Sequence, residues 1–130
     1  VMYAPPITPV PLSGFEVAGL LNLRGHIVTA LHSDRFFNLA FKESLHKKMC
    51  IVLQNDEDEL YSFIVDKVCD IESLDLDLFE PLPMHMCEQW DMFADGVFRL
   101  QDRVIIGLNR EKMLKKLLNE DGFDFPEKST

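Results

Sequence analysis

Four adjacent residues, Met84-His85-Met86-Cys87, carry side chains that could hold a soft metal ion. Thioether, imidazole and thiolate groups are the ligands that ions such as Cu(I) prefer. The four are adjacent rather than spaced, however, and the sequence has no second cluster of this kind. We therefore interpret the segment as a loop with apolar anchors and expect no metal or cofactor, and we keep a small metal- or ligand-responsive protein as an alternative.

A second group, His26, His32 and Asp34, could supply an acid and base pair. Alternation along a strand would put the two histidines on one face, with Asp34 beyond the end of the strand. No serine elbow, phosphate-binding loop or paired metal motif accompanies them in the sequence. We therefore expect no catalytic residues, and an enzyme that uses these three groups is the less favoured alternative.

The overall charge excludes several classes of partner. The chain has 130 residues, with 22 acidic and 13 basic side chains and a formal net charge of -9. This negative field repels nucleic acid and anionic lipid headgroups.

The longest apolar runs, such as 104–108, are far shorter than the roughly 20 residues of a membrane-spanning helix. Three widely spaced cysteines suit reduced thiols, and no secretory signal opens the chain, so we expect a cytoplasmic protein without membrane insertion.

The elements that must position these residues are mostly strands. Residues 1–4 indicate the end of a strand, and the four prolines of residues 5–11 favour an extended or sheet-edge segment. Branched apolar residues with turn chemistry at Asn22 and Gly25 predict two strands around a tight turn within 17–31. Two apolar runs around the acidic loop 54–59 predict a further hairpin, and 35–39 a short helix or turn.

The second half of the chain ends in a hairpin and a helix. Leucines alternate with acids between Asp70 and Glu80, which predicts an exposed edge or irregular segment. The segment from Met84 to Trp90 is expected to be a loop. Residues 95–100 and 103–108 predict a hairpin around Gln101-Asp102. Apolar residues at helical spacing then predict an amphipathic helix from Arg110 that ends near Asp121-Gly122; they are Met113, Leu114, Leu117 and Leu118.

A weak internal repeat connects the two halves. Residues 19–31 align without gaps against residues 96–108, at an offset of 77 residues. Each copy begins with glycine and continues through lead-in residues and a polar turn into an apolar strand. One hairpin unit used in two related barrels would produce this pattern, although many unrelated hairpins would align equally well.

These residues resemble the CheW family. Residues 17–28 are similar to its signature, a glycine followed by the Asn-Leu-Arg-Gly turn, here Asn22 to Gly25, and then a strand. Residues 63–68, Phe-Ile-Val-Asp-Lys-Val, are similar to the family's Ile-Val-Asp-x-Val strand, and 95–114 to its closing hairpin and terminal helix. The order and spacing agree from about residue 6 to residue 116.

The resemblance implies a mainly β fold of two small, five-stranded, SH3-like barrel lobes with a short C-terminal helix. We expect residues 1–130 to form one such domain. In the family, part of the first barrel comes from strands upstream of the signature, and those strands are largely absent here. The chain would then be a fragment, or a divergent member, or one whose numbering begins after an unlisted segment.

The resemblance also implies a non-catalytic adaptor that couples chemoreceptors to the CheA histidine kinase in chemotaxis. In the family, one barrel binds the regulatory domain of CheA, and the cytoplasmic tip of the receptor docks between the barrels near the arginine turn. Carried over, Arg24 and Gly25 would shape the receptor side, Gly19 would permit close backbone approach, and Ile7 would face the kinase. The candidate partner-binding residues are Ile7, Gly19, Leu21, Asn22, Arg24, Gly25, Val97, Asp102 and Arg103.

Two departures leave alternatives open. His32-Ser33-Asp34 replaces the family's usual Asp-Leu-Arg, and Thr29 stands where a proline is common. We therefore keep a second interpretation, a scaffold of another receptor-kinase pathway, such as surface motility, or part of a hybrid protein.

Arg24 could fork onto a partner's carboxylate or form an internal ion pair that fixes the turn. Three aromatic residues could anchor a partner but are each better interpreted as core; they are Phe15, Trp90 and Phe98.

Overall fold

The computed structural model describes residues 1–40 and 48–119, and it divides into two compact units. Unit 1 takes in residues 1–69 and unit 2 residues 70–120. Unit 1 contains β1 (Met2–Tyr3), β2 (Val17–Leu23), β3 (His26–His32), α1 (Ser33–Phe36), β4 (Met49–Gln54) and β5 (Leu60–Val65). Unit 2 contains a 3₁₀ turn η1 (Leu76–Leu78), β6 (Phe79–Glu80), α2 (Met84–Trp90), β7 (Ala94–Arg99), β8 (Val104–Leu108) and α3 (Arg110–Asn119).

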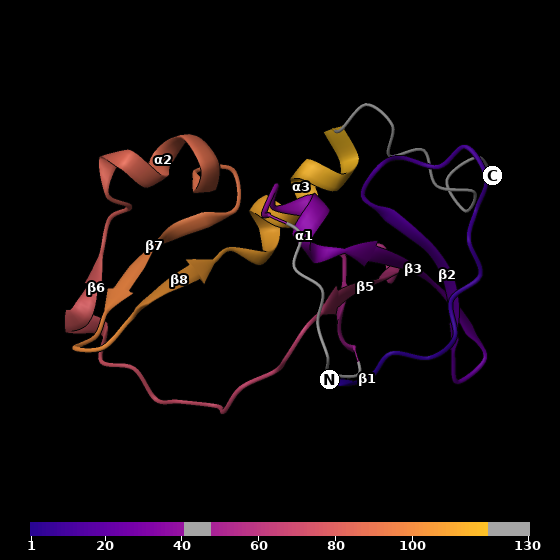
Figure 1. The fold of residues 1–130 in the computed structure, drawn as a ribbon, viewed down its shortest axis with the longest axis horizontal. Coiled ribbons are helices and arrows are strands. Elements are labelled where there is room, and N and C mark those ends of the chain that lie inside the picture. Colours follow the sequence, from indigo (N-terminus) through magenta and orange to yellow (C-terminus); the bar gives the residue numbers. More distant parts are fainter. Residues whose placement is uncertain (41–47, 120–130) are drawn as a thin grey trace. The chain divides into compact units, whose positions relative to one another are not determined.

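The sheet of unit 1 has five strands in the order β1-β4-β5-β3-β2, and its two edges are joined by one segment (Figure 1). Met2 and Tyr3 pair with β4 at one edge. Thr8 exchanges two backbone hydrogen bonds of 2.8 Å with Leu20 of β2 at the other edge. Pro5-Pro6 stands between these pairings, where a residue without an N–H donor breaks no ladder. Residues 2–8 thereby close the sheet into a barrel, as predicted for an extended edge segment.

The core of unit 1 fills the interior of the barrel that this sheet forms. Val28, Ala30 and Leu31 of β3 are fully buried, because β3 is flanked by β2 and, in parallel, by β5. The rings of Phe36 and Phe63 pack edge to face with centroids 5.1 Å apart. Both predicted hairpins of this unit are confirmed, β2–β3 around Arg24-Gly25 and β4–β5 around the acidic loop.

Unit 2 has a three-stranded sheet in the order β6-β7-β8. The mainly β class with a short C-terminal helix is confirmed, but the described part of the second lobe holds three strands where the resemblance implies five. The sheet of unit 1 closes within the described residues, although the resemblance places part of the first barrel upstream of the signature. Residues 2–8 serve both edges of the first sheet, so the smaller sheet belongs to unit 2.

The internal repeat is confirmed residue by residue. Gly19 pairs with Ala30 and Gly96 with Gly107, which are the same positions at the offset of 77 residues. A bulge follows Val17 in the first hairpin and Ala94, its equivalent, in the second. The neighbouring segment repeats as well, since Thr8 lies against Leu20 as Glu80 lies against Val97. Both units are therefore built on the same three-segment motif.

The prediction of a loop from Met84 to Trp90 was wrong, because these residues form α2. Pro81-Leu82-Pro83 suggested continued irregular structure, yet Pro83 occupies the N-cap position, where a missing N–H costs no helical hydrogen bond. No glycine, proline or β-branched residue interrupts the next seven positions. The preceding acidic segment is exposed and irregular, as predicted, with its 3₁₀ turn capped by the Asp75 carboxylate.

The predicted C-terminal helix is confirmed as α3. Asn109 caps it, because its side-chain oxygen accepts a 3.0 Å hydrogen bond from the N–H of Lys112. Met113, Leu114 and Leu117 are buried. The side chain of Leu118 and the predicted end near Asp121-Gly122 lie outside the described residues.

Candidate partner-binding site

The β2–β3 turn presents the candidate residues of unit 1. Leu23 pairs with His26, which leaves a two-residue turn of Arg24 and Gly25 with φ angles of 51° and 87°. Positive φ at both positions is the pattern of a type I′ turn, whose twist matches the strands that it connects. The side-chain oxygen of Asn22 accepts a 2.8 Å hydrogen bond from the N–H of Gly25. Asn22 and Gly25 therefore hold the turn in place.

Arg24 stands at the tip of this turn with its side chain exposed. A left-handed backbone is unusual for arginine, and the structure places no ion-pair or hydrogen-bond partner on its guanidinium among residues 1–40 and 48–119. The internal ion pair that the sequence left open is therefore not formed within the described chain. The five N–H donors of the guanidinium stay available to a carboxylate or carbonyl of a partner.

Gly19 permits the close backbone approach expected of it. A Cβ atom at this position would overlap the carbonyl oxygen of Thr8, and the backbone has a φ of 146°. Gly96 has the same relation to the carbonyl oxygen of Glu80. Both glycines act by shape, letting a third segment lie against the hairpin behind its turn.

Three apolar candidates lie mostly inside the structure. Leu21 is 3% exposed and Val97 is fully buried, so both support the surface rather than forming it. Ile7 is half-buried against the cluster of buried residues that includes Leu21, Val28 and Ile64. Alternation along the strands explains this burial, because every second residue of β2 and β7 faces inward.

Asp102 and Arg103 lie in the β7–β8 turn of unit 2, at the positions equivalent to Gly25 and His26. Both carboxylate oxygens of Glu72 accept hydrogen bonds of 2.7 Å from the same terminal nitrogen of Arg103. Asp102 lies 3.6 Å from its other terminal nitrogen. The guanidinium of Arg103 is therefore engaged within its own unit, in contrast to that of Arg24.

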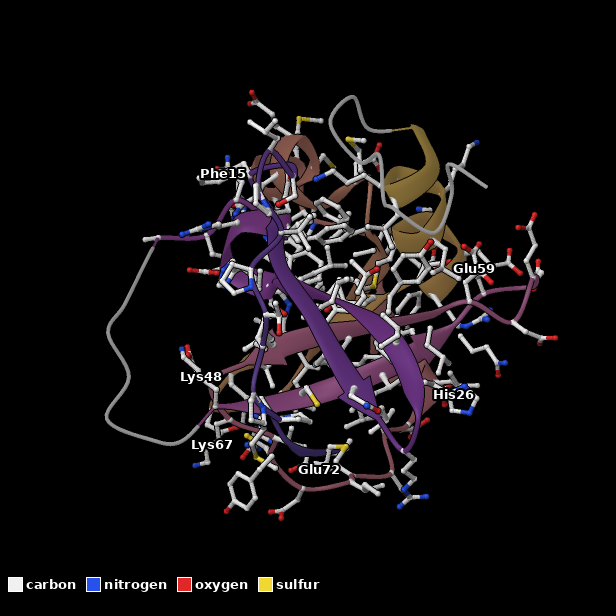
Figure 2. The ribbon with its side chains drawn as sticks, turned by 90° about the vertical axis from the view of Figure 1, so that its right-hand side faces the viewer. Phe15, His26, Lys48, Glu59, Lys67 and Glu72 are labelled. Carbon is white, nitrogen blue, oxygen red and sulfur yellow. The ribbon has the colours of Figure 1, made fainter. Side chains whose placement is uncertain are left out.

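Sequence reasoning missed a shallow hollow at the opposite end of β2 from Arg24. Phe15, which the sequence favoured as core, is 70% exposed, and Arg35 lies over its ring at 4.8 Å. Figure 2 labels Phe15 and His26, the residue after the turn, on opposite sides of unit 1. Residues 34, 35, 38 and 39 line the hollow together with Phe15. The sequence offered one cue to this site, the aromatic Phe15 close to a turn, but this cue alone did not predict its exposure.

The side chains needed for the metal alternative and for the catalytic alternative do not come together in the described residues. Successive residues of α2 are rotated by about 100° around the helix, so residues 84–87 cannot point at one ion together. No group of three potential ligands comes together among histidines, cysteines and acids in the described residues. His26 and His32 occupy opposite ends of the seven-residue β3, which separates their imidazoles by most of a strand.

Two side chains have shifted proton affinities. Burial lowers the pKa of His32 below its ordinary value of 6.5, and the positive charge of Arg35 lowers it further. Hydrogen bonds from Asn109 and Lys112 lower the pKa of the Asp95 carboxyl. Lys112 also donates a 2.9 Å hydrogen bond to the carbonyl of Ala94. This network fixes the start of α3 beside β7.

Comparison with known proteins identifies the family. The profile of the CheW-like domain matches residues 1–118. The chain belongs to the CheW-like domain family. This CheW-like domain is 27% identical over 119 residues to the chemotaxis protein CheW of Thermotoga maritima, an alignment that covers 89% of the chain and 74% of that relative.

A solved structure supports the fold of this CheW-like domain independently. The scaffolding protein TtCheW of Thermoanaerobacter tengcongensis matches with a TM-score of 0.74 at 21% identity. The match covers 90% of the chain and 77% of TtCheW. Within the described residues, none of the helices of this CheW-like domain is both long and apolar enough to cross a bilayer.

The residues that depart from the family pattern lie largely inside unit 1. Thr29 is fully buried and Ser33 is 9% exposed. His32 and Asp34 are half-buried. The departures therefore alter the core and the end of β3 more than the exposed turn around Arg24.

Proposed function

We propose that this chain is a non-catalytic adaptor that couples chemoreceptors to a CheA-type histidine kinase. The observation that carries this proposal is the match to the CheW-like domain family over residues 1–118. Two relatives, named as a chemotaxis protein and as a scaffolding protein, support it. A receptor tip and a kinase of this kind would place the chain in the cytoplasm.

The receptor side of the proposal rests on the β2–β3 turn. Arg24 is exposed and has no ion-pair partner in the described chain, and its turn is fixed by Asn22 and Gly25. A guanidinium held on a rigid turn loses little freedom when it binds a carboxylate. We assign the cytoplasmic tip of a chemoreceptor to this surface.

The kinase side of the proposal lies around Ile7. This half-buried residue belongs to the segment that closes the barrel of unit 1, next to the edge of β2. We assign the regulatory domain of the kinase to the surface around this segment. In unit 2, the β7–β8 turn with Asp102 and Arg103 is the equivalent of the β2–β3 turn and a further candidate for partner contact. Val97 supports this hairpin from the interior.

The mechanism needs no covalent step. Two modest interfaces on one scaffold raise the effective concentration of each partner near the other. A conformational change in the receptor could then alter the kinase through shared contacts. Buried Gly19, Leu21 and Val97 would keep both surfaces rigid.

Substitution of Arg24 by alanine tests the receptor assignment. We expect the affinity for a receptor cytoplasmic fragment to fall by about 1.5 to 3 kcal/mol, the range for hydrogen bonds to charged groups. Affinity for the kinase regulatory domain is expected to change little. Titration calorimetry against each purified partner measures both effects.

Lys67→Ala is the matched control, because it also removes one exposed positive charge from unit 1. Figure 2 shows Lys67 on the other side of this unit from His26 and the turn. The control should bind both partners as the unsubstituted protein does. Equal loss of both partners in Arg24→Ala, together with a lower melting temperature, would show that Arg24 is structural.

A further inference from the structure

Unit 1 has a surface feature that the proposed coupling function does not use. It is the shallow hollow between the loop before β2 and helix α1, lined by Phe15 and Leu39 among others. Phe15 is 70% exposed and Leu39 is 43% exposed. The hollow has a volume of about 260 Å³, far more than a single water molecule needs. It can therefore take a large side chain of a bound segment.

The chemistry of the hollow combines an aromatic ring with a cation. Nη1 of Arg35 donates a 3.1 Å hydrogen bond to the carbonyl of Phe15, and the guanidinium lies 4.8 Å from the centroid of the Phe15 ring. These two contacts hold the two side chains together. Arg35 forms no ion pair within residues 1–40 and 48–119. Its remaining N–H donors can bind a carboxylate.

We propose that this hollow binds the C-terminal segment of the same chain, residues 120–130. The segment reads Glu-Asp-Gly-Phe-Asp-Phe-Pro-Glu-Lys-Ser-Thr, with four acids, one base and two phenylalanines. Its acidic and aromatic character complements the cationic and aromatic character of the hollow. Phe123 enters the hollow beside Phe15, and the carboxylate of Asp121 pairs with Arg35.

The order of residues in the segment supports this assignment. Pro126 favours an extended backbone at Phe125, the residue before it. In an extended segment, residues two apart face the same side, so Asp121, Phe123 and Phe125 share one face. A carboxylate and an aromatic ring can therefore approach the hollow together.

The segment is favoured over a separate partner because it is tethered. A short flexible connection gives a bound segment an effective concentration in the millimolar range, so a contact of two or three side chains suffices. The six residues from Glu120 to Phe125 can extend by up to about 20 Å. A net charge of -9 would repel a separate acidic peptide more than it penalises a segment that is already attached. This inference does not rest on the proposed coupling function.

Limited digestion of the full chain with chymotrypsin, which cuts after phenylalanine, tests the contact. We expect slow cleavage after Phe123 in the unsubstituted protein. Phe15→Ala and Arg35→Glu should each speed this cleavage by about fivefold or more, because cleavage follows the population of the undocked segment. Both side chains lie at the surface, so the variants should keep the circular dichroism spectrum of the folded protein.

Lys67→Glu is the matched control, since it makes the same change of charge at an exposed position of unit 1. Figure 2 shows Lys67 at the other end of this unit from Phe15. Cleavage after Phe123 should be unchanged in this variant. Asp121→Lys combined with Arg35→Glu should restore slow cleavage, because the pair of charges is then exchanged.

Amide exchange tests the hollow without altering unit 1. Phe123→Ala in the full chain should speed exchange of the amides of residues 34–39, while those of β7 stay unchanged. Equally fast cleavage in the unsubstituted protein and in Phe15→Ala, an equal effect of Lys67→Glu, or no restoration by the double variant would overturn the proposal. So would unchanged exchange in Phe123→Ala, or protection that appears only as the protein concentration rises, which would assign the hollow to another copy.

Discussion

Gly19 and Gly96 lack the one atom that would collide with a carbonyl oxygen of the neighbouring segment. Gly19→Ala and Gly96→Ala should therefore each lower the free energy of unfolding by at least about 2 kcal/mol, because the third segment must move away from the hairpin. Gly25→Ala provides the comparison, since no atom lies within 4 Å of its missing Cβ. It should cost only about 1 kcal/mol, the penalty for a positive φ angle. Urea unfolding of the three variants measures the difference, and equal losses would contradict this account.

The lowered pKa of His32 makes a prediction about pH. Between its folded pKa and the ordinary value of 6.5, the unfolded chain holds a proton at His32 that the folded chain does not. The unfolded state then binds more protons, so stability should fall as the pH is lowered through this window. It should level off below the folded pKa.

His32→Gln should remove this part of the pH dependence. The measurement is the free energy of unfolding at several pH values for both proteins. The difference between the two curves should change between neutral and mildly acidic pH and nowhere above it. A constant difference over that range would show that the side chain titrates normally.

At the scale of single residues, the sequence predicted backbone roles better than side-chain partners. Gly25 could be assigned from its turn context, and the close approach at Gly19 from the family resemblance. Arg24 has no ion-pair partner among the described residues, whereas Arg103 pairs with Glu72. This contrast could not be predicted, because Glu72 lies 31 residues from Arg103 in the chain. Alternation along the strands is consistent with burial of Leu21 and Val97. The family resemblance nevertheless led us to name both as partner-binding candidates.

Among the elements, α3 depends on the cap at Asn109. This side chain accepts a hydrogen bond from Lys112 and donates one of 2.8 Å to the Asp95 carboxylate. Asn109→Ala should lower the free energy of unfolding by about 1 to 2 kcal/mol, the usual cost of losing a helix N-cap. Lys115→Ala, an exposed position on the same helix, should stay within about 0.5 kcal/mol. Thermal unfolding followed by circular dichroism compares them, and equal effects would argue against the cap.

Elements with a clear hydrophobic period were predicted from the sequence. Helix α2, which has no such period, was not predicted. Both members of the repeated hairpin and α3 follow from alternation or helical spacing. In α2, the neighbouring prolines outweighed a weak helical signal, although a proline just before a helix is well tolerated. The physical cue that was available is the unbroken run of helix-compatible residues from Met84 to Trp90.

At the scale of the whole molecule, long-range pairing was the part that the sequence could not supply. One segment closes the barrel of unit 1 by pairing with β4 through Met2 and Tyr3 and with β2 through Thr8. These partners lie far apart in the chain, and no local pattern specifies them. The same limit explains why the sequence did not show how the first barrel closes.

The central claim concerns two partners held at once by one scaffold. The most direct test is a titration of the purified protein with the kinase regulatory domain and a receptor cytoplasmic fragment, followed by analysis of the complex by size and composition. We predict a ternary complex in which neither partner displaces the other. Binding of neither partner by the folded protein, or mutual displacement at a shared surface, would contradict the coupling function.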